Sequence, residues 1–156
     1  MTPISRKILR AIEAIVYIAL YHGAQPVNGK KLADKQGLPP RYLERVLQKL
    51  VHEGILRSVR GPRGGYVLAK ERRRISIGEI YRVVLESDDE IDSTRLTPIG
   101  ELIIQPVCMD ATNTLLEHLD TITIAQMCEK AYAGGHVQSH LEGRVRAAGA
   151  RQDFAI

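Results

Sequence analysis

The 156-residue chain is 44% hydrophobic and 26% charged, as in an ordinary globular protein. It has no run of the roughly 20 apolar residues that cross a membrane, and its two cysteines, Cys108 and Cys128, are too few for a secreted disulfide scaffold, so we expect a cytoplasmic protein. Residues 1–82 carry 17 Lys and Arg against 6 Asp and Glu (net +11), whereas residues 83–156 carry 5 against 12 (net −7), which indicates a polyanion-binding half joined to an acidic one.

The N-terminal half is predicted to hold three helices. Apolar residues recur at helical spacing from Ser5 to Tyr21, which gives that segment one apolar face. A short helix over residues 30–35 is expected to stop at Gly37, and only a few residues separate it from a third. The third starts near Pro40, a residue tolerated in the first turn, and its apolar residues from 43 to 51 again keep to one face.

A hairpin is predicted directly after the third helix. The period changes from helical to extended, with strands expected at residues 55–60 and 66–69. The tip between them is rich in glycine and reads Gly61-Pro62-Arg63-Gly64-Gly65. Three helices followed by a hairpin, or wing, is the order of a winged helix-turn-helix. In that fold the third helix lies in the DNA major groove and the wing tip reaches the neighbouring groove.

The C-terminal half is predicted to be helical. Ser76-x-x-Glu79 is a capping box, in which the Ser oxygen and the Glu carboxylate satisfy backbone donors at the start of a fourth helix. Pro106 is expected to break or kink any helix that runs through it. Beyond Pro106, a 4-3-4-3 spacing typical of a coiled-coil seam is formed by Cys108, Thr112, Leu115, Leu119 and Ile122. A second capping box, Thr123-x-x-Gln126, opens a last short helix.

These elements predict a mainly α fold with four segments. Residues 1–86 form a winged helix-turn-helix of three helices and a two-stranded wing, and residues 87–97 form an acidic linker. Residues 98–132 form a helical dimerisation region, in which Leu115, Leu119 and Ile122 are the expected contacts. Residues 133–156 form a weakly patterned tail.

The third helix carries polar residues suited to reading bases. Outside its apolar face, near its start, lie Arg41, Tyr42, Glu44 and Arg45. Arg can donate two hydrogen bonds to guanine, Glu can accept one from cytosine, and Tyr can reach a phosphate. The alternative for each of these residues is an ordinary solvated helix face.

The wing indicates DNA binding more strongly than the third helix does. Arg60 and Arg63 flank the turn, and an arginine at such a tip suits a narrow, strongly negative minor groove. Gly64 and Gly65 would let the backbone approach a phosphate chain closely. The alternative is a surface hairpin with incidental arginines.

The sequence also resembles a known family. The segments that carry the resemblance are residues 37–44, the wing sequence SVRGPRGGYVL over residues 58–68, and residues 75–80. They resemble the winged-helix transcription regulators related to IscR, NsrR and CymR, over residues 5 to about 131. The resemblance implies a homodimer, held by a long C-terminal helix of each chain, that reads a palindromic operator. It also implies that Tyr42, Leu43 and Glu44 match the Tyr-Leu-Glu of the recognition helix, whose Glu reads bases, and that Arg60 matches a wing arginine that enters the minor groove.

The cysteines depart from the family pattern. Cluster-binding members carry three closely spaced cysteines between the fourth helix and the dimerisation helix, and this chain has none there, so we expect no iron–sulfur cluster and no other cofactor. Cys108 and Cys128 lie on apolar stripes, where a thiol usually packs as a small hydrophobe. The alternative is a redox sensor, which needs partial exposure and a lowered pKa. Cys128, His136 and His140 lack a fourth zinc ligand, so no metal site is expected.

The leading hypothesis is a sequence-specific, homodimeric repressor of transcription that binds double-stranded DNA. One alternative is a winged-helix protein-interaction module whose acidic C-terminal part binds a basic partner, and another is a redox-sensing regulator that uses Cys108 or Cys128. We do not expect an enzyme, because the sequence has no nucleophile motif, phosphate loop or paired catalytic carboxylates. The signal sensed, the operator and the choice between repression and activation stay open.

Overall fold

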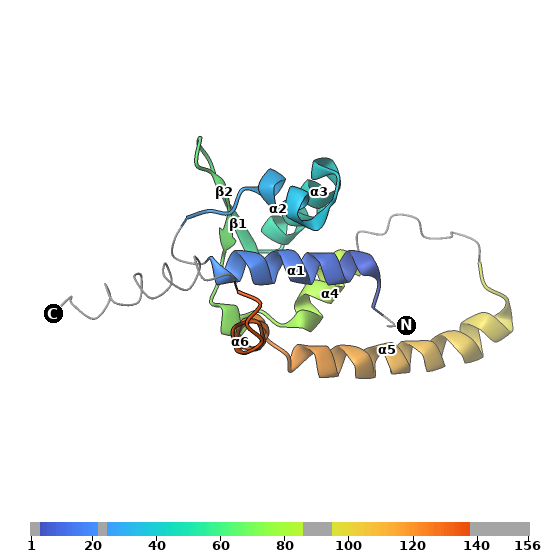
Figure 1. Cartoon of the computed structure of the whole chain (residues 1–156). Helices are drawn as coiled ribbons and strands as arrows, with labels where there is room; N and C mark the ends of the chain where they lie inside the picture. The colour runs from blue at the N-terminus through green and yellow to red at the C-terminus, as the bar shows by residue number, and fades with distance from the viewer. Residues whose placement is uncertain (1–3, 22–24, 86–94, 138–156) are drawn as a thin grey trace.

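The structure is a computed structural model that describes residues 4–21, 25–85 and 95–137 (Figure 1). Most of the predicted linker and tail, at residues 86–94 and 138–156, lies outside the described residues, as does His140. Within the described ranges the elements are α1 (Arg6–Leu20), α2 (Gly29–Gln36), α3 (Pro40–His52), β1 (Leu56–Val59), β2 (Gly65–Leu68), the 3-10 turn η1 (Arg72–Arg74), α4 (Ile77–Leu85), the π-helical turn η2 (Gly100–Ile104), α5 (Gln105–Asp120) and α6 (Ile124–Ala133).

Side-chain caps start the first two helices, and a glycine ends the second. Ser5 caps α1 by accepting the Ile8 N–H at 3.4 Å. Asn28 caps α2, since its Oδ1 accepts the backbone N–H groups of Lys30 and Lys31 at 3.0 and 3.1 Å. Gly37 then ends α2 in the left-handed conformation, with φ +63°, as predicted.

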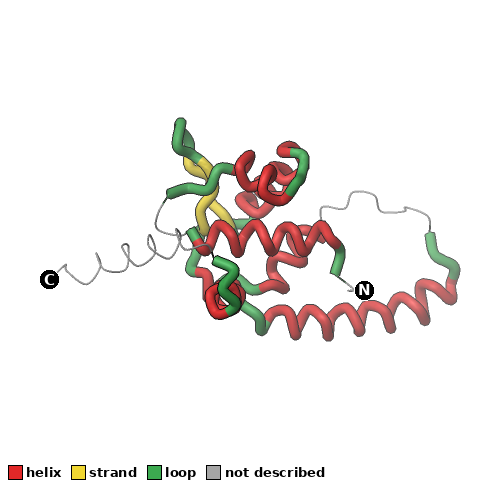
Figure 2. The backbone as a smooth tube through the Cα atoms, viewed as in Figure 1, coloured by secondary structure: helices red, strands yellow, loops and turns green. Residues whose placement is uncertain are grey.

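The wing is an antiparallel pair of strands, paired from Leu56 opposite Leu68 to Val59 opposite Gly65. Figure 2 shows this hairpin projecting beside α2 and α3. Three helices followed by a two-stranded wing confirm the predicted winged helix-turn-helix. One contact was not foreseen: Val27, just before α2, pairs with Tyr66 of β2 through two backbone hydrogen bonds of 2.9 and 2.8 Å.

One hydrophobic core joins the winged helix to the C-terminal helices. Helix α1 contacts α3, α4, α6 and β2, and in Figure 1 it separates α2, α3 and the wing on one side from α5 and α6 on the other. The core includes Ile15 and Leu47 from the first helices, and also Leu119, Ile124 and Cys128. The predicted dimerisation region is therefore anchored to the same core as the predicted DNA-binding domain.

Pro106 was predicted to break or kink the helix; the chain does not break there, but its α-helical hydrogen bonding begins only at Gln105, directly before the proline. The chain runs from the π-helical turn η2 directly into α5, and the Gln105 N–H donates to the Gly100 carbonyl. Because the hydrogen-bond spacing changes at Gln105, Pro106 falls in the first turn of α5, where no amide donor is needed. The helix therefore continues through the proline to Asp120.

The expected seam from Cys108 to Ile122 is wrong at its end, because α5 stops at Asp120. Ile122 lies in the connection to α6, where its carbonyl accepts the Ile77 N–H at 2.8 Å. The Ile124 N–H donates to the Ile75 carbonyl at 2.9 Å, so this connection forms an antiparallel bridge with the residues before α4. Those backbone bonds replace the helical bonds that would have continued α5.

Of the two capping boxes, one forms fully and one in part. Thr123 and Gln126 exchange both hydrogen bonds at the start of α6. Ser76 accepts the Glu79 N–H at 3.0 Å, as expected. The Glu79 carboxylate instead pairs with Lys70, at 2.5 Å, so its predicted bond to the backbone is wrong. The Lys70 ammonium supplies a charge-assisted hydrogen bond in place of the backbone amide.

Candidate nucleic-acid interface

The packing of α3 fixes which of its residues face outwards. Leu43, Val46, Leu47 and Leu50 are buried on its inner face. The four residues predicted to read bases, Arg41, Tyr42, Glu44 and Arg45, are all exposed. A helix that buries one stripe must present the intervening positions to solvent. The outer face of α3 therefore offers two cations, one carboxylate and one phenol.

The wing places Arg60 and Arg63 in solvent around a turn closed by the Gly64 N–H on the Gly61 carbonyl, at 2.9 Å. The hairpin itself requires the two glycines after this turn. A Cβ added to Gly64 would lie 2.3 Å from the Val59 carbonyl oxygen, and one added to Gly65 would lie 2.3 Å from that of Val27. Close backbone packing within the protein thus explains Gly64 and Gly65, whereas their predicted approach to phosphate stays a prediction.

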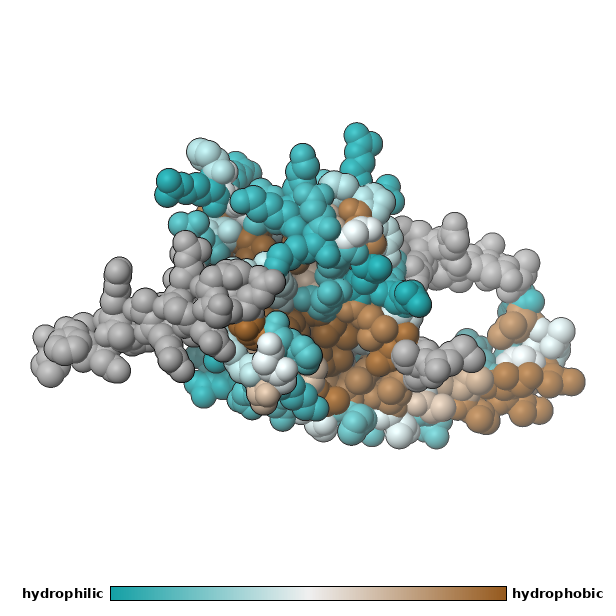
Figure 3. All heavy atoms as spheres, in the orientation of Figure 1, coloured by the Kyte–Doolittle hydropathy of each residue, from teal (hydrophilic) through white to brown (hydrophobic). Residues whose placement is uncertain are grey.

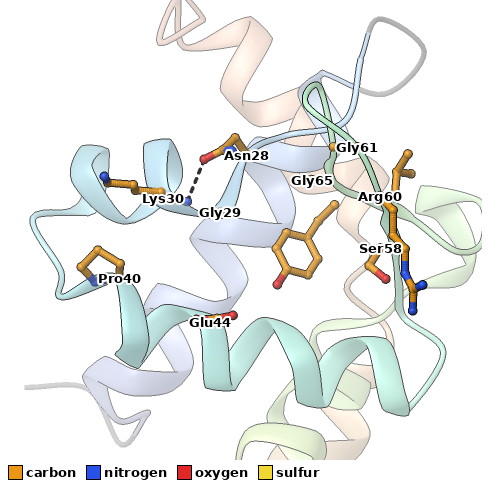
Figure 4. Close-up of a pocket in the computed structure, with 12 residues that line it drawn as sticks. Asn28, Gly29, Lys30, Pro40, Glu44, Ser58, Arg60, Gly61 and Gly65 are labelled. Atoms are coloured by element: carbon orange, nitrogen blue, oxygen red, sulfur yellow. Dashed lines mark hydrogen bonds between the residues drawn. The ribbon is translucent and has the colours of Figure 1, made fainter.

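A groove of about 460 Å³ separates the wing from α2 and α3. Figure 4 shows Lys30 at the start of α2, Glu44 on α3, and Ser58 and Arg60 on the wing arranged around it. The Gln48 amide donates to Glu44 Oε1 at 3.3 Å. Cations from two elements and a carboxylate from a third therefore line one opening.

Tyr66 lines the same groove and was missed by sequence reasoning. A Cβ on Gly29 would lie 3.0 Å from the Tyr66 ring, so the absence of a side chain at the start of α2 makes room for it. Burial raises the pKa of Tyr66, and the negative charge of Glu44 adds to the rise. The phenol therefore stays neutral and able to donate a hydrogen bond. The period-2 pattern of the wing placed Tyr66 in a strand but gave no sign of its contact with α2.

The cations of this surface are available to a ligand. Among the described residues, Arg41, Arg45, Arg60 and Arg63 form no ion pair; the ion pairs of arginine are those of Arg73, Arg82 and Arg95. Figure 3 shows hydrophilic side chains over the face that carries α2, α3 and the wing. The acidic C-terminal residues that the structure describes do not neutralise these arginines.

The two cysteines lie in opposite environments. Cys128 is fully buried in the core, and burial raises the pKa of its thiol despite the opposing effect of Arg72. A buried thiol with a raised pKa lacks both properties of a redox sensor. Cys108 is exposed on α5, so the prediction that it packs as a hydrophobe is wrong within this chain. The reason is that Cys108 lies near the start of α5, at the end that projects from the body of the molecule, and α5 meets the core only toward Leu119.

The three predicted dimerisation residues lie against the protein's own core. Leu119 is buried, and Leu115 and Ile122 are partly buried beside it. Most of the exposed large apolar side chains belong instead to the outer half of the long helix and the residues before it: Leu96, Ile99, Leu102, Ile103, Ile104, Val107 and Met109. Figure 3 shows them as a hydrophobic patch at the free end of α5.

Within residues 4–21, 25–85 and 95–137, no three His, Cys, Asp or Glu side chains lie together as metal ligands. In the same ranges, no helix has the length and apolar character to span a bilayer.

The chain is similar in sequence and in structure to known regulators of transcription. A family model described as "Rrf2: Iron-dependent Transcriptional regulator" matches residues 4–130. The transcriptional regulator IscR of Salmonella paratyphi B is 30% identical over 152 residues, which cover 92% of this chain and 90% of that protein. The structure of IscR from T. potens matches with a TM-score of 0.67 and 31% identity, over 90% of this chain and 96% of that one. The structure of CymR, the global cysteine regulator of B. subtilis, matches with a TM-score of 0.62 and 28% identity, over 83% of this chain and 98% of that one.

Proposed function

Because the chain belongs to the Rrf2 family of transcriptional regulators, we propose that it is a homodimeric repressor that reads a palindromic DNA operator with α3 and the wing. The observation that carries the proposal is the set of exposed, unpaired arginines on these two elements, beside the groove that holds Glu44. Such a surface suits a polyanion with readable base edges. The named relatives are regulators of transcription, so we propose no enzymatic activity.

The two elements take different tasks in this proposal. Arg41, Arg45 and Glu44 enter the major groove, where Arg pairs with guanine and Glu with cytosine. Tyr42, which is 38% exposed, contacts the phosphate backbone. Arg60 and Arg63 reach the adjacent minor groove, where a narrow A·T-rich segment has its most negative potential.

A second copy of the chain covers the apolar end of α5. Leu102 is 76% exposed and Val107 is 67% exposed, and a contiguous apolar patch of this kind marks an interface. A two-fold axis through the patch makes the contact self-complementary and places two α3 helices in a symmetric pair. Two recognition helices related by a two-fold axis require a palindromic DNA site. We assign the dimer contact to these residues in place of Leu119, which is buried within its own chain.

The proposed regulator works without an iron–sulfur cluster. The whole sequence contains two cysteines, whereas a cluster of the family type takes three thiolates from one chain. Cys128 is buried in the core and Cys108 is exposed on α5, so the residues present do not fit such a group.

The proposal is tested by measuring DNA affinity on promoter fragments from the source genome and on random duplexes, at several salt concentrations. We expect a specific site to bind about 10³-fold or more tightly than random DNA, with affinity falling steeply with salt because bound phosphates release counterions. Weak binding without preference, together with recovery of a protein partner in pull-downs, would instead support the interaction-module alternative.

A further inference from the structure

A second cavity lies between the C-terminal end of α1 and the outer face of α2. It holds about 260 Å³ and is lined by two tyrosines, two lysines and apolar side chains, among them Tyr17, Tyr21, Val27, Leu32, Lys31 and Lys35. Nothing in the proposed reading of DNA uses Tyr17, Tyr21 or Lys35. The volume is below the roughly 300 to 1,000 Å³ of sites for drug-sized ligands, so a single substituted ring is the size that fits.

The two tyrosines form an ordered aromatic wall. The Tyr17 hydroxyl donates to the Tyr21 hydroxyl at 2.8 Å, and the ring centroids are 4.7 Å apart at an angle of 42°. Both residues are only partly buried, so their rings border the cavity. A tilted pair of phenols gives this wall an aromatic surface that a flat ligand can contact.

Among the residues that the structure describes, the charged side chains that line the cavity have one sign. They are Lys31 and Lys35, with no Asp or Glu. Lys35 Nζ lies 4.5 Å from the centroid of the Tyr17 ring, so this cation is already held over the aromatic wall. Among the described residues neither lysine forms an ion pair. A bound carboxylate or phosphate would gain a charge-assisted hydrogen bond there.

The cavity is connected to the wing by two residues. Val27 lines it and also pairs with Tyr66 of β2 through both of its backbone groups. Asn28 lines it too, caps α2, and also lines the groove beside Glu44. A ligand that displaces this short segment therefore displaces the contact that positions the wing.

We propose that this cavity is an effector site for a small aromatic carboxylate or phosphate ester, and that its occupancy changes DNA affinity through the Val27–Tyr66 contact. The ligand site stands independently of DNA. The effect on affinity rests on the function proposed above.

Binding is tested by NMR titration of the full chain with labelled tyrosines, using benzoate and phenyl phosphate as probes and neutral benzamide as the comparison. We expect saturable shifts of the Tyr17 and Tyr21 ring signals, each assigned with its Tyr→Phe variant. Benzamide should bind the wild type about tenfold more weakly than benzoate does, and benzoate should bind the Lys35→Ala variant about tenfold more weakly than the wild type. A factor of ten corresponds to one charged hydrogen bond. Lys130→Ala removes an exposed lysine on α6 and should leave binding unchanged.

Two outcomes of the titration would overturn the site. One is the absence of saturable shifts at both tyrosines with either probe up to about 10 mM, beyond the range of weak specific binding. The other is equal binding of benzoate to wild type and to Lys35→Ala.

The link to DNA is measured separately, as operator affinity with and without a saturating probe. A change in affinity that is lost in Lys35→Ala supports the link, and unchanged affinity while the tyrosine shifts persist overturns it. If Lys31 and Lys35 instead contact DNA phosphates, the double alanine variant will show a flatter salt dependence without any probe, which contradicts the effector role. Failure to bind any DNA would overturn the proposed function and leave the titration result standing.

Discussion

At the scale of single residues, Glu44 is the side chain on which sequence preference depends. It is exposed on the face of α3 that borders the groove, and the Gln48 amide donates to its carboxylate. A carboxylate cannot contact phosphate favourably, so its presence among arginines is explained by a base donor such as cytosine N4. The arginines around it would supply most of the sequence-independent affinity.

Replacement of Glu44 by Ala should therefore change which sequence is preferred. We expect discrimination against the wrong base at one operator position to fall by about 1 to 3 kcal/mol, while affinity for random DNA holds or rises. Selection from a randomised operator library, compared between the variant and wild type, measures this directly. Glu53→Ala, which removes an exposed carboxylate after the end of α3, is the control and should keep the wild-type preference. Equal loss on specific and random DNA for Glu44→Ala would contradict the assigned role.

Cys128 should be unreactive in the folded protein. In a Cys108→Ser variant the remaining thiol is fully buried, with a pKa raised by burial. We expect no labelling by iodoacetamide near pH 8 until the chain unfolds, followed by complete labelling in denaturant, as detected by mass spectrometry. Because the folded pKa lies above the unfolded one, this thiol stabilises the fold below its unfolded pKa, and that contribution is lost as pH rises through the folded value. Rapid labelling of the native variant would restore Cys128 as a candidate redox sensor.

At the scale of elements, the junction between α4 and α5 ties the long helix to the winged helix. Arg82 donates to both oxygens of Asp120 at 2.8 and 2.6 Å, and the Ser76 hydroxyl donates to the same carboxylate at 3.3 Å. A Cβ on Gly78 would strike the Asp120 side chain, so the two helices meet closely at this point. The hydrogen bond from Arg82 lowers the pKa of Asp120.

Replacement of Asp120 by Asn should destabilise the fold by a modest amount that depends on pH. The pair is about 40% exposed, which limits its contribution to about 1 kcal/mol or less. A carboxyl group with a lowered folded pKa stabilises the protein above its unfolded pKa, and that contribution is lost as pH falls through the folded value. Thermal unfolding should therefore show a gap between variant and wild type at pH 7 that narrows as the pH falls below 3.8, the ordinary pKa of an Asp side chain. A gap that stays constant over this range would show that packing, rather than charge, holds the junction.

Replacement of Gly65 by Ala should destabilise the wing. The added methyl group would lie 2.3 Å from the Val27 carbonyl oxygen, so the bridge between Val27 and Tyr66 must open. We expect a loss of about 1 to 3 kcal/mol in unfolding free energy, together with weaker DNA binding. Ser58→Ala, at an exposed position of β1, is the matched control for stability and should unfold like wild type. Unchanged stability in Gly65→Ala would show that the bridge contributes little to the wing.

These elements also show how far the sequence alone could lead. Helical spacing, the stop at Gly37, Pro40 in a first turn and the glycine-rich tip were enough to predict α1, α2, α3 and the wing, because local patterns determine them. The Val27–Tyr66 bridge and the bridge that ends α5 could not be predicted, since each joins residues far apart in sequence. The same limit explains Leu119, whose heptad spacing is equally consistent with packing on its own core.

At the scale of the whole molecule, the cationic surface and the exposed apolar patch lie on separate sides. The cationic surface of α2, α3 and the wing lies on one side of α1, and the free end of α5 lies on the other (Figures 1 and 3). A dimer built through α5 would leave both cationic surfaces open to DNA.

Insertion of a charge into the apolar end of α5 should separate the dimer. Val107→Glu places a carboxylate in the proposed interface, where burial without a partner is costly. We expect a monomer by light scattering at concentrations where wild type is dimeric, and operator binding weakened by about tenfold or more because two half-sites are no longer joined. Ala133→Glu, at the exposed end of α6, is the control and should stay dimeric. A wild type that is monomeric by light scattering would contradict the proposed dimer.

The central claim, that the arginines of the wing contact DNA, is tested most directly by the salt dependence of operator affinity. Arg60→Ala combined with Arg63→Ala is compared with Arg95→Ala combined with Lys130→Ala, which removes the same charge from the C-terminal half. The account predicts that the wing variant binds more weakly and that its slope of log affinity against log salt is flatter by about one to two, while the control keeps the wild-type slope. Equal slopes for the wing variant and wild type, or an equal loss in the control, would contradict it.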